Sequence, residues 1–294
     1  MPLYFFLSGL FFKPYENYSG FLTRKVNKLL IPFLFFHILS CIIIPLRHRT
    51  PFEWHILWDW IFSQCVYPNG PLWFLVCLLW LNQIFYALFK IANRVHYPVG
   101  FIIGSSIIIG ITGYCIGRYG YNIDAMNIGT AMTAIPFFCA GYVFRRYTKI
   151  LEPNSWDKYL PFIVLPLAFL TVYFAGPVHY FENQYDVNLL SVYGCGLSGV
   201  LCVLFISKML GHLPLVSYFG RYSIMILVSH ILVIDFFLPQ VYRLNCICWI
   251  KVIILTSIVL LLSLIIIPIM KRYLPHVTAQ KDLIPIRQSR MIAK

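Results

Sequence analysis

Apolar residues gather in nine runs along the chain, and the stretches between the runs hold most of its charged residues. A membrane-spanning helix needs about 20 apolar residues, and all runs but the first are close to that length or can cross with some tilt. The pattern predicts an all-α protein, a polytopic membrane helix bundle of about nine segments. The runs cover residues 1–12, 29–46, 71–90, 97–116, 129–145, 159–175, 187–206, 221–239 and 249–270.

The first run is short. Only 12 residues precede Lys13, and as a helix they reach about 18 Å, against a hydrocarbon core of about 30 Å. We therefore expect the chain to begin inside a membrane helix. The run has neither a basic start nor a small-residue cleavage site, so it does not read as a signal peptide.

The composition changes the meaning of the net charge. The chain is 60% hydrophobic and only 11% charged, whereas a soluble domain carries about 25% charged residues. A net charge of +13 would suggest nucleic acid in a soluble protein. If residues 13–28 face the cytoplasm and the segments alternate, 18 of the 23 Lys and Arg residues face the cytoplasm, as the positive-inside rule requires.

This distribution predicts a multi-pass protein of the plasma or inner membrane with a cytoplasmic C-terminus. It makes membrane lipid the expected partner and excludes nucleic acid. We expect one transmembrane domain over residues 1–275 and a basic cytoplasmic tail over 276–294. The nine cysteines form no CxxC pair, so the sequence indicates no metal site.

An aromatic stretch lies in the predicted outer loop 47–70. Trp54 and Trp58 are four residues apart and share one face of a helix. Their rings could stack on a sugar, or they could lie at the level of the lipid headgroups in an interfacial helix.

Ionisable residues inside apolar runs are costly in a bilayer and are functional candidates. His37 lies in the second run, and His230 and Asp235 lie in the eighth. His230 is near the middle of the membrane, where it could act chemically or bond to a neighbouring helix. Asp235 is five residues further on, so the two side chains do not share a helix face. His37 reads as a structural residue.

A basic cluster precedes the second run. Lys25 and Lys28 are three residues apart on the predicted cytoplasmic side, and Arg24 flanks them. Such a cluster suits the phosphate groups of coenzyme A. It equally suits a positive-inside anchor that contacts lipid headgroups.

Five short motifs, in order along nearly the whole chain, resemble the membrane acyltransferase 3 family, and its fucose 4-O-acetylase-like branch in particular. KVNKLLIP is similar to the family pattern R-x-x-R-L-x-x-P, with Lys25 and Lys28 in place of Arg. The other four are MPLYFFLSGLFF, GPLWFL, AIPFFCAGYVFRR and YFGRYSIMILVSH.

The resemblance implies an enzyme that moves an acetyl or other short acyl group from cytoplasmic acetyl-CoA to a hydroxyl of an extracytoplasmic glycan or lipid-linked sugar. His230 and Ser8 are the expected catalytic residues, and Trp73 and Ser223 are expected to bind the acceptor. The expected coenzyme A ligands are Arg24, Lys25, Lys28 and Arg221.

The resemblance leaves two further interpretations open. The family's first helix carries an Arg and a His that act in catalysis, and this chain opens after that helix, so it is either a late start of a longer protein or an inactive remnant. A transporter or lipid-linked glycan flippase would also fit nine or ten helices. Matching pairs of broken helices, which mark many transporters, are not seen in the sequence.

Overall fold

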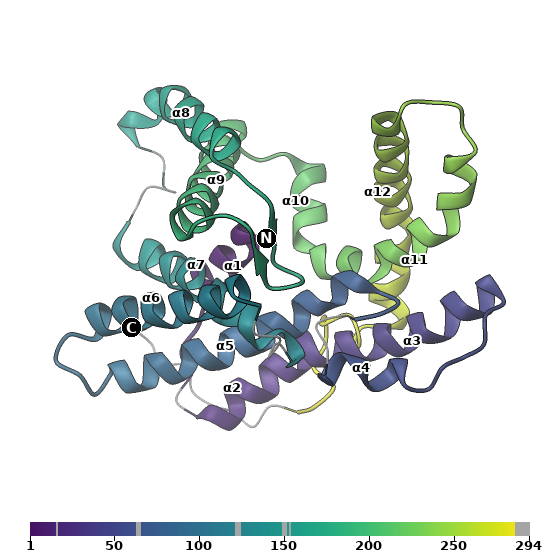
Figure 1. Ribbon diagram of the computed structural model, residues 1–294, viewed down its shortest axis with the longest axis horizontal. Helices are drawn as coiled ribbons and strands as arrows, with labels where there is room; N and C mark the ends of the chain where they lie inside the picture. The colour runs from purple at the N-terminus through teal and green to yellow at the C-terminus, as the bar shows by residue number, and fades with distance from the viewer. Residues whose placement is uncertain (16, 63–65, 121–124, 149–151, 153, 286–294) are drawn as a thin grey trace. The chain divides into compact units, whose positions relative to one another are not determined.

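The computed structural model of the chain consists almost entirely of helices (Figure 1) and describes residues 1–15, 17–62, 66–120, 125–148, 152 and 154–285. Each of the nine predicted apolar segments forms one helix, so the predicted all-α class is confirmed. These helices are α1 (Pro2–Leu10), α3 (Ile31–His48), α5 (Trp73–Ala92), α6 (Pro98–Arg118), α7 (Ile128–Tyr147), α8 (Leu160–Tyr173), α9 (Leu189–Leu210), α11 (Ser223–Tyr242) and α12 (Cys248–Tyr273).

Shorter elements connect these helices. The α-helical ones are α2 (Tyr18–Lys25), α4 (Ile56–Phe62) and α10 (Pro214–Arg221). A π-helical turn, η1 (Val26–Leu30), joins α2 to α3, and the 3-10 turns are η2 (Gly70–Leu72), η3 (Ala125–Asn127) and η4 (Ser155–Tyr159). Two short strands, β1 (Val178–His179) and β2 (Gln184–Tyr185), form an antiparallel hairpin.

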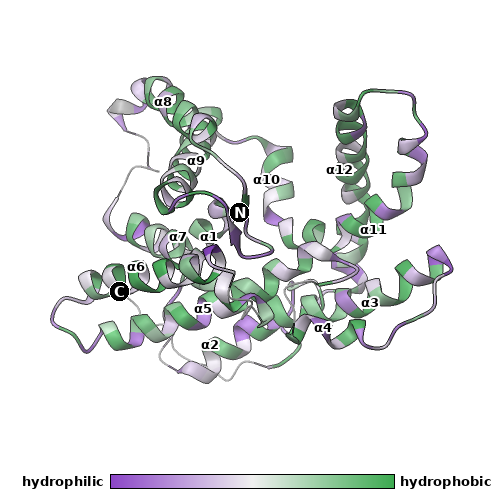
Figure 2. Cartoon of the chain, viewed as in Figure 1, coloured by the Kyte–Doolittle hydropathy of each residue, from purple (hydrophilic) through white to green (hydrophobic). Residues whose placement is uncertain are grey.

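Within the described residues, seven helical stretches are long and apolar enough to cross a membrane, which makes the chain a multi-pass membrane protein. In Figure 2, α12 is hydrophobic along nearly its whole length. A helix that is apolar on every side suits a lipid environment. The seven stretches are Tyr18–His48, Gly70–Ala92, Pro98–Arg118, Ala125–Tyr147, Leu189–Leu210, Ser223–Tyr242 and Cys248–Tyr273.

Two of the nine predicted segments are shorter than a membrane span. Helix α1 has 9 residues, in line with its short apolar run. Helix α8 has 14 residues, about 21 Å, although its run was expected to cross the membrane. A capping box between Asn154 and Asp157 begins the 3-10 turn η4, and α8 starts only after that turn.

The basic segment before α3 is helical rather than a loop. Residues 18–48 form one continuous helical stretch, interrupted only by the π turn η1. Pro32 has no N–H to donate to the carbonyl of Lys28, and its ring would crowd that carbonyl in a regular α-helix. The wider turn removes the conflict, and the N–H of Ile31 bonds five residues back to Val26. Such π turns occur frequently at functional sites.

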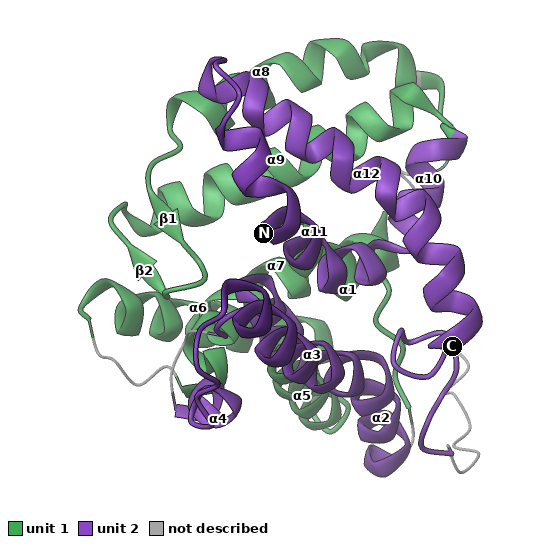
Figure 3. Cartoon of the chain, turned by 90° about the vertical axis from the view of Figure 1, so that its right-hand side faces the viewer, with its two compact units in different colours: residues 1–16, 80–213, 290–294 green, residues 17–79, 214–289 purple. Residues whose placement is uncertain are grey.

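The chain divides into two compact units, which Figure 3 shows in different colours. The first unit comprises the described residues among 1–15 and 80–213, and the second comprises those among 17–79 and 214–285. The boundary passes through α5.

Glycines let helices approach closely in the first unit. Helix α1 packs on α7, where Gly9 faces the backbone carbonyl of Phe138 and Gly141 faces that of Phe6. A side chain at either glycine would overlap the facing carbonyl oxygen. Small residues that allow such backbone contact are the usual packing device of membrane helices. Gly9 is the glycine of the first motif, MPLYFFLSGLFF.

We expect Gly141→Ala to lower the free energy of unfolding by about 1–3 kcal/mol, the cost of overpacking a tight contact. The matched control is Gly104→Ala in α6, where no atom lies within 4 Å of an added methyl group. Thermal unfolding in detergent micelles compares the two variants. Equal melting temperatures for both would show that the α1–α7 contact is looser than described.

Helices α8 and α9 of the first unit pair as antiparallel neighbours. Thr171 of α8 lies 2.9 Å from Ser198 of α9 between their hydroxyl oxygens. Near the other end of the pair, Lys208 Nζ donates to Asp157 Oδ1 at 2.6 Å, and this bond lowers the pKa of the Asp157 carboxyl. The β1–β2 hairpin is held by Arg118, which donates to the Tyr185 carbonyl at 2.8 Å.

Candidate active site

A row of polar residues follows helices α3 and α11 in the second unit. Asn69 joins the two helices, because its Nδ2 donates to Ser40 Oγ at 3.0 Å and to the Val228 carbonyl at 3.2 Å. Seven residues further along both helices, Arg47 meets Asp235. Helices α3 and α11 therefore run parallel, in a register that pairs 40 with 228 and 47 with 235.

The ends of this row lie far apart. From Lys28 to Ser40 the helix rises about 18 Å, and from Ser40 to Arg47 about 10 Å. The total is close to the thickness of the hydrocarbon core, about 30 Å. The row thus has a basic end at Lys28, a buried middle at Ser40 and a charged far end at Arg47.

Three ionisable side chains meet at the far end. Asp235 bonds to the guanidinium of Arg47, and His48 Nε2 lies 2.8 Å from Asp235 Oδ1. Arg47 Nη2 also donates to the Phe236 carbonyl at 3.0 Å. The pairing explains how Asp235 is tolerated in an apolar helix, since paired and hydrogen-bonded charges are the ones that membranes accept. Asp235 therefore belongs to this cluster, and His230 has other partners.

His230 lies on α11 between the middle and the far end. Its Nδ1 lies 2.8 Å from the Leu227 carbonyl and 3.0 Å from the Ile226 carbonyl. A carbonyl oxygen only accepts, so Nδ1 carries the hydrogen. In the neutral ring the lone pair is then on Nε2, the atom that a general base would use. The ring is only partly buried, unlike that of His37.

His37 is enclosed by other side chains. Its ring stacks on Phe33, with a centroid distance of 5.5 Å and an angle of 5°, and lies next to the Cys41 thiol. Only 1% of the residue is exposed. These contacts indicate that His37 has a structural role in helix packing.

Asn69 is completely buried. Both hydrogens of its amide are used, but no described residue donates to its Oδ1. A buried acceptor without a donor costs about 1–3 kcal/mol, so such atoms are rare and commonly have a functional reason. The residue directly precedes the motif GPLWFL, whose Trp73 opens α5 and is 4% exposed.

Three of the four predicted coenzyme A ligands, Arg24, Lys25 and Lys28, lie at the basic end or next to it in sequence. Lys25 Nζ lies 5.5 Å from the centre of the Phe21 ring, whereas Lys28 Nζ donates to the Ala279 carbonyl at 2.5 Å and lies 3.5 Å from Asp282 Oδ1. Arg24 directly precedes Lys25 in the sequence and is partly buried. Arg221 ends α10 and is exposed.

The remaining predicted site residues are divided between the units. Ser223 is the first residue of α11, two helical turns before His230 on the same face. Ser8 lies on α1 in the first unit, directly before Gly9. Seven of the eight predicted residues thus belong to the second unit, and Ser8 does not.

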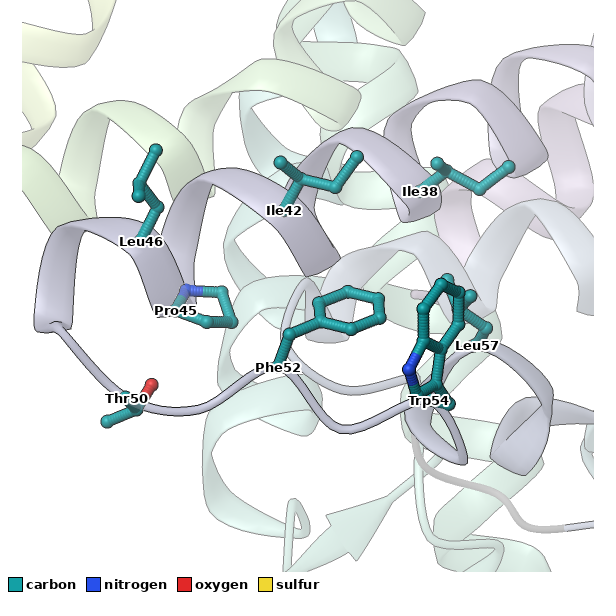
Figure 4. A pocket seen from close by; sticks show the side chains of 8 residues that line it. All are labelled: Ile38, Ile42, Pro45, Leu46, Thr50, Phe52, Trp54 and Leu57. Atoms are coloured by element: carbon teal, nitrogen blue, oxygen red, sulfur yellow. The ribbon is translucent and has the colours of Figure 1, made fainter.

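An apolar groove of about 500 Å³ lies beside α3 in the second unit (Figure 4). Side chains from two turns of the helix form one wall, and Phe52 and Trp54 from the following loop and Leu57 from α4 form the other. Only Thr50 and the Trp54 indole bring polar side-chain atoms. The groove therefore suits a hydrocarbon chain better than a sugar. Its residues on α3 and at its end are Ile38, Ile42, Pro45, Leu46 and Thr50.

Taken together, the fold and the row define a class: a polytopic helical membrane protein with a histidine base candidate and polar clusters at the basic end, the middle and the far end of one helix pair. A model of the acyltransferase 3 family, described as an acyltransferase domain, matches residues 1–270. The chain belongs to this family, and the protein is an acyltransferase. No curated protein and no solved structure matches the chain.

Sequence reasoning missed Ser40, Asn69, Arg47 and His48 of the row, and Asn27 next to its basic end. Asn69 precedes a motif that was recognised, and Asn27 lies inside the motif KVNKLLIP. Arg47 is the first residue of the predicted outer loop 47–70, and the sequence analysis used it only as one of the positive charges on that side. The turn pattern around Asn69 could have signalled it. An Asn between Pro68 and Gly70 is typical of a turn, where its side-chain amide is available for hydrogen bonds.

Proposed function

We propose that the protein transfers an acetyl or other short acyl group from cytoplasmic acetyl-CoA to a hydroxyl of an extracytoplasmic glycan. The observation that carries the proposal is His230, whose Nδ1–H is held by the Leu227 carbonyl and whose Nε2 is thereby the basic atom. The family supplies the reaction class, acyl transfer. Its fucose 4-O-acetylase-like branch, which the motifs resemble, makes a fucose-containing glycan the first acceptor to test.

In this proposal the basic end faces the cytoplasm. Arg24, Lys25, Lys28 and Arg221 bind the phosphate groups of the donor, because ammonium and guanidinium groups form short, charge-assisted bonds to phosphate. The thioester arm follows α3 toward the middle of the row. The acceptor enters from the far end and reaches the middle of the row, and Trp73 and Ser223 help to bind it there.

The chemical step needs one base and a group that stabilises negative charge. His230 Nε2 takes the proton of the acceptor hydroxyl, and the oxygen attacks the thioester carbonyl carbon. The tetrahedral oxyanion then collapses, the carbon–sulfur bond breaks, and the thiolate of coenzyme A leaves with the proton from His230. A hydroxyl or N–H donor close to the thioester carbonyl would stabilise the oxyanion.

The test uses the full chain in vesicles of known orientation, with acetyl-CoA labelled in the acetyl group. We expect label to appear in an alkali-labile ester on the glycan, and only when the donor is on the side of Lys28 and the acceptor is on the side of Arg47. Fucosylated, galactosylated and glucosylated oligosaccharides form the acceptor panel. A folded protein that transfers no label to any of them, from acetyl-CoA or a longer acyl-CoA, would remove the proposal.

A further inference from the structure

The segment after α12 folds back as a compact turn. The N–H groups of Gln280 and Lys281 both bond to the Pro275 carbonyl, at 3.0 and 2.9 Å, and Thr278 within the turn is 1% exposed. We call residues 275–285 the strap. These residues are the described part of the stretch predicted as a basic tail, together with Pro275.

The strap is bonded to the π turn between α2 and α3. Asn27 Oδ1 accepts from the N–H groups of Leu283 and Ile284 at 3.1 and 2.9 Å, and Asn27 Nδ2 donates to the Ile284 carbonyl at 2.9 Å. Asn27 is completely buried. One side chain in the basic motif thus binds three backbone groups of a segment more than 250 positions further along the chain.

The residue next to Asn27 binds the strap by charge. Lys28 Nζ donates to the Ala279 carbonyl at 2.5 Å and lies 3.5 Å from Asp282 Oδ1. The Lys28 and Asp282 side chains are 43% and 36% exposed, so their pairing is screened by water and weak. Lys28 is also one of the cations to which the proposed function assigns donor phosphate.

The bound form of the strap contains backbone strain. Ala279 has a φ of 61°, in the left-handed region that a residue with a Cβ avoids. Such strain persists only where surrounding contacts impose it, and it is found at switch segments. Here the Ala279 carbonyl is itself an acceptor for Lys28, so the contact and the strain belong to the same conformation.

We propose that the strap is an autoinhibitory segment that competes with the donor's phosphate groups for Lys28. This inference rests on the proposed function, because it takes acyl-CoA as the ligand of the basic end. With the strap bound, Lys28 is occupied by Asp282 and by the Ala279 carbonyl. When acyl-CoA binds, its phosphate replaces Asp282 on Lys28, and the strap leaves Asn27.

The test measures strap release and donor binding on the same full-length protein in detergent. Hydrogen exchange reads the amides of Leu283 and Ile284, which donate to Asn27, and calorimetry reads the Kd for acetyl-CoA. We expect saturating acetyl-CoA to speed exchange at both amides at least tenfold. Asp282→Asn should lower the Kd by about 1.4- to 5-fold, the range that an exposed ion pair of about 0.2–1 kcal/mol supports.

Two further variants separate competition from a general change in charge. Asp186→Asn makes the same change at an exposed carboxylate in the first unit, 4.0 Å from Arg118, and should leave the Kd unchanged. Ala279→Gly relieves the strained φ of the bound strap without altering any charge, and should raise the Kd about two- to threefold.

The outcomes distinguish the two proposals. If acetyl-CoA binds but leaves exchange at Leu283 and Ile284 slow, or if Asp282→Asn and Ala279→Gly shift the Kd in the same direction, the strap does not compete and the donor assignment stands. If neither the unchanged protein nor any of the variants binds acetyl-CoA, both the donor assignment and the proposed role of the strap are wrong.

Discussion

Replacing His230 with Asn is expected to slow acyl transfer by about 10²- to 10⁴-fold, the contribution of a positioned general base. Asn keeps an N–H donor close to the place of Nδ1, so the bond to the Leu227 carbonyl can be retained. It has no basic nitrogen at the place of Nε2. The measurement is kcat in the vesicle assay with labelled acetyl-CoA. A variant that keeps more than a third of the activity would exclude His230 as the base.

Two controls separate chemistry from folding. His96→Gln alters an exposed histidine in the turn between α5 and α6 and should leave kcat unchanged. His230→Ala opens space at the ring position, and added imidazole should restore part of its activity. Rescue by a free base is a response that a purely structural histidine would not give.

The helices were predictable because a long apolar segment in a membrane has few backbone structures open to it. Backbone groups in lipid must bond within their own segment, so each long apolar run becomes a helix. Two helices differ from the prediction, and in both the difference lies near residues that the apolar pattern does not describe. The polar composition of residues 18–28 gave no apolar period, yet the segment is helical up to Pro32 and widens into a π turn there. Helix α8 has only 14 residues and begins after the 3-10 turn η4, which the Asn154–Asp157 capping box opens.

The site was predictable only in part, since motifs name residues but not their partners. His230 was singled out by its cost in lipid, whereas its bond to Leu227 depends on side-chain rotation. Nothing local connects Asn27 to Ile284 or Arg47 to Asp235, which are 257 and 188 positions apart. Such pairs follow from helix register and from the path of the chain after α12, and a single sequence contains neither directly.

The Arg47–Asp235 pair gives the second large effect. Asp235→Asn is expected to lower the free energy of unfolding by about 1–3 kcal/mol, less than removing one partner of a fully buried ion pair costs, because this pair is only partly buried. The side chains of Arg47 and Asp235 are only 24% and 20% exposed. Once the Asp235 charge is removed, little water can solvate the Arg47 guanidinium. Chemical unfolding in detergent micelles measures the change, and His48→Gln, at a side chain 47% exposed, should cost less than 1 kcal/mol.

The double variant Arg47→Met, Asp235→Leu tests the reason for that loss. Apolar side chains of similar volume often replace a buried pair without loss of stability, because neither charge then has to leave water. We therefore expect the double variant to unfold within about 1 kcal/mol of the unchanged protein, and to be more stable than Asp235→Asn alone. Additive losses in the two single variants would instead mean that Arg47 and Asp235 act separately. In that case the pair would not fix the register of α3 against α11, and the position of His230 along the row would have to depend on Asn69 and its bonds to Ser40 and Val228.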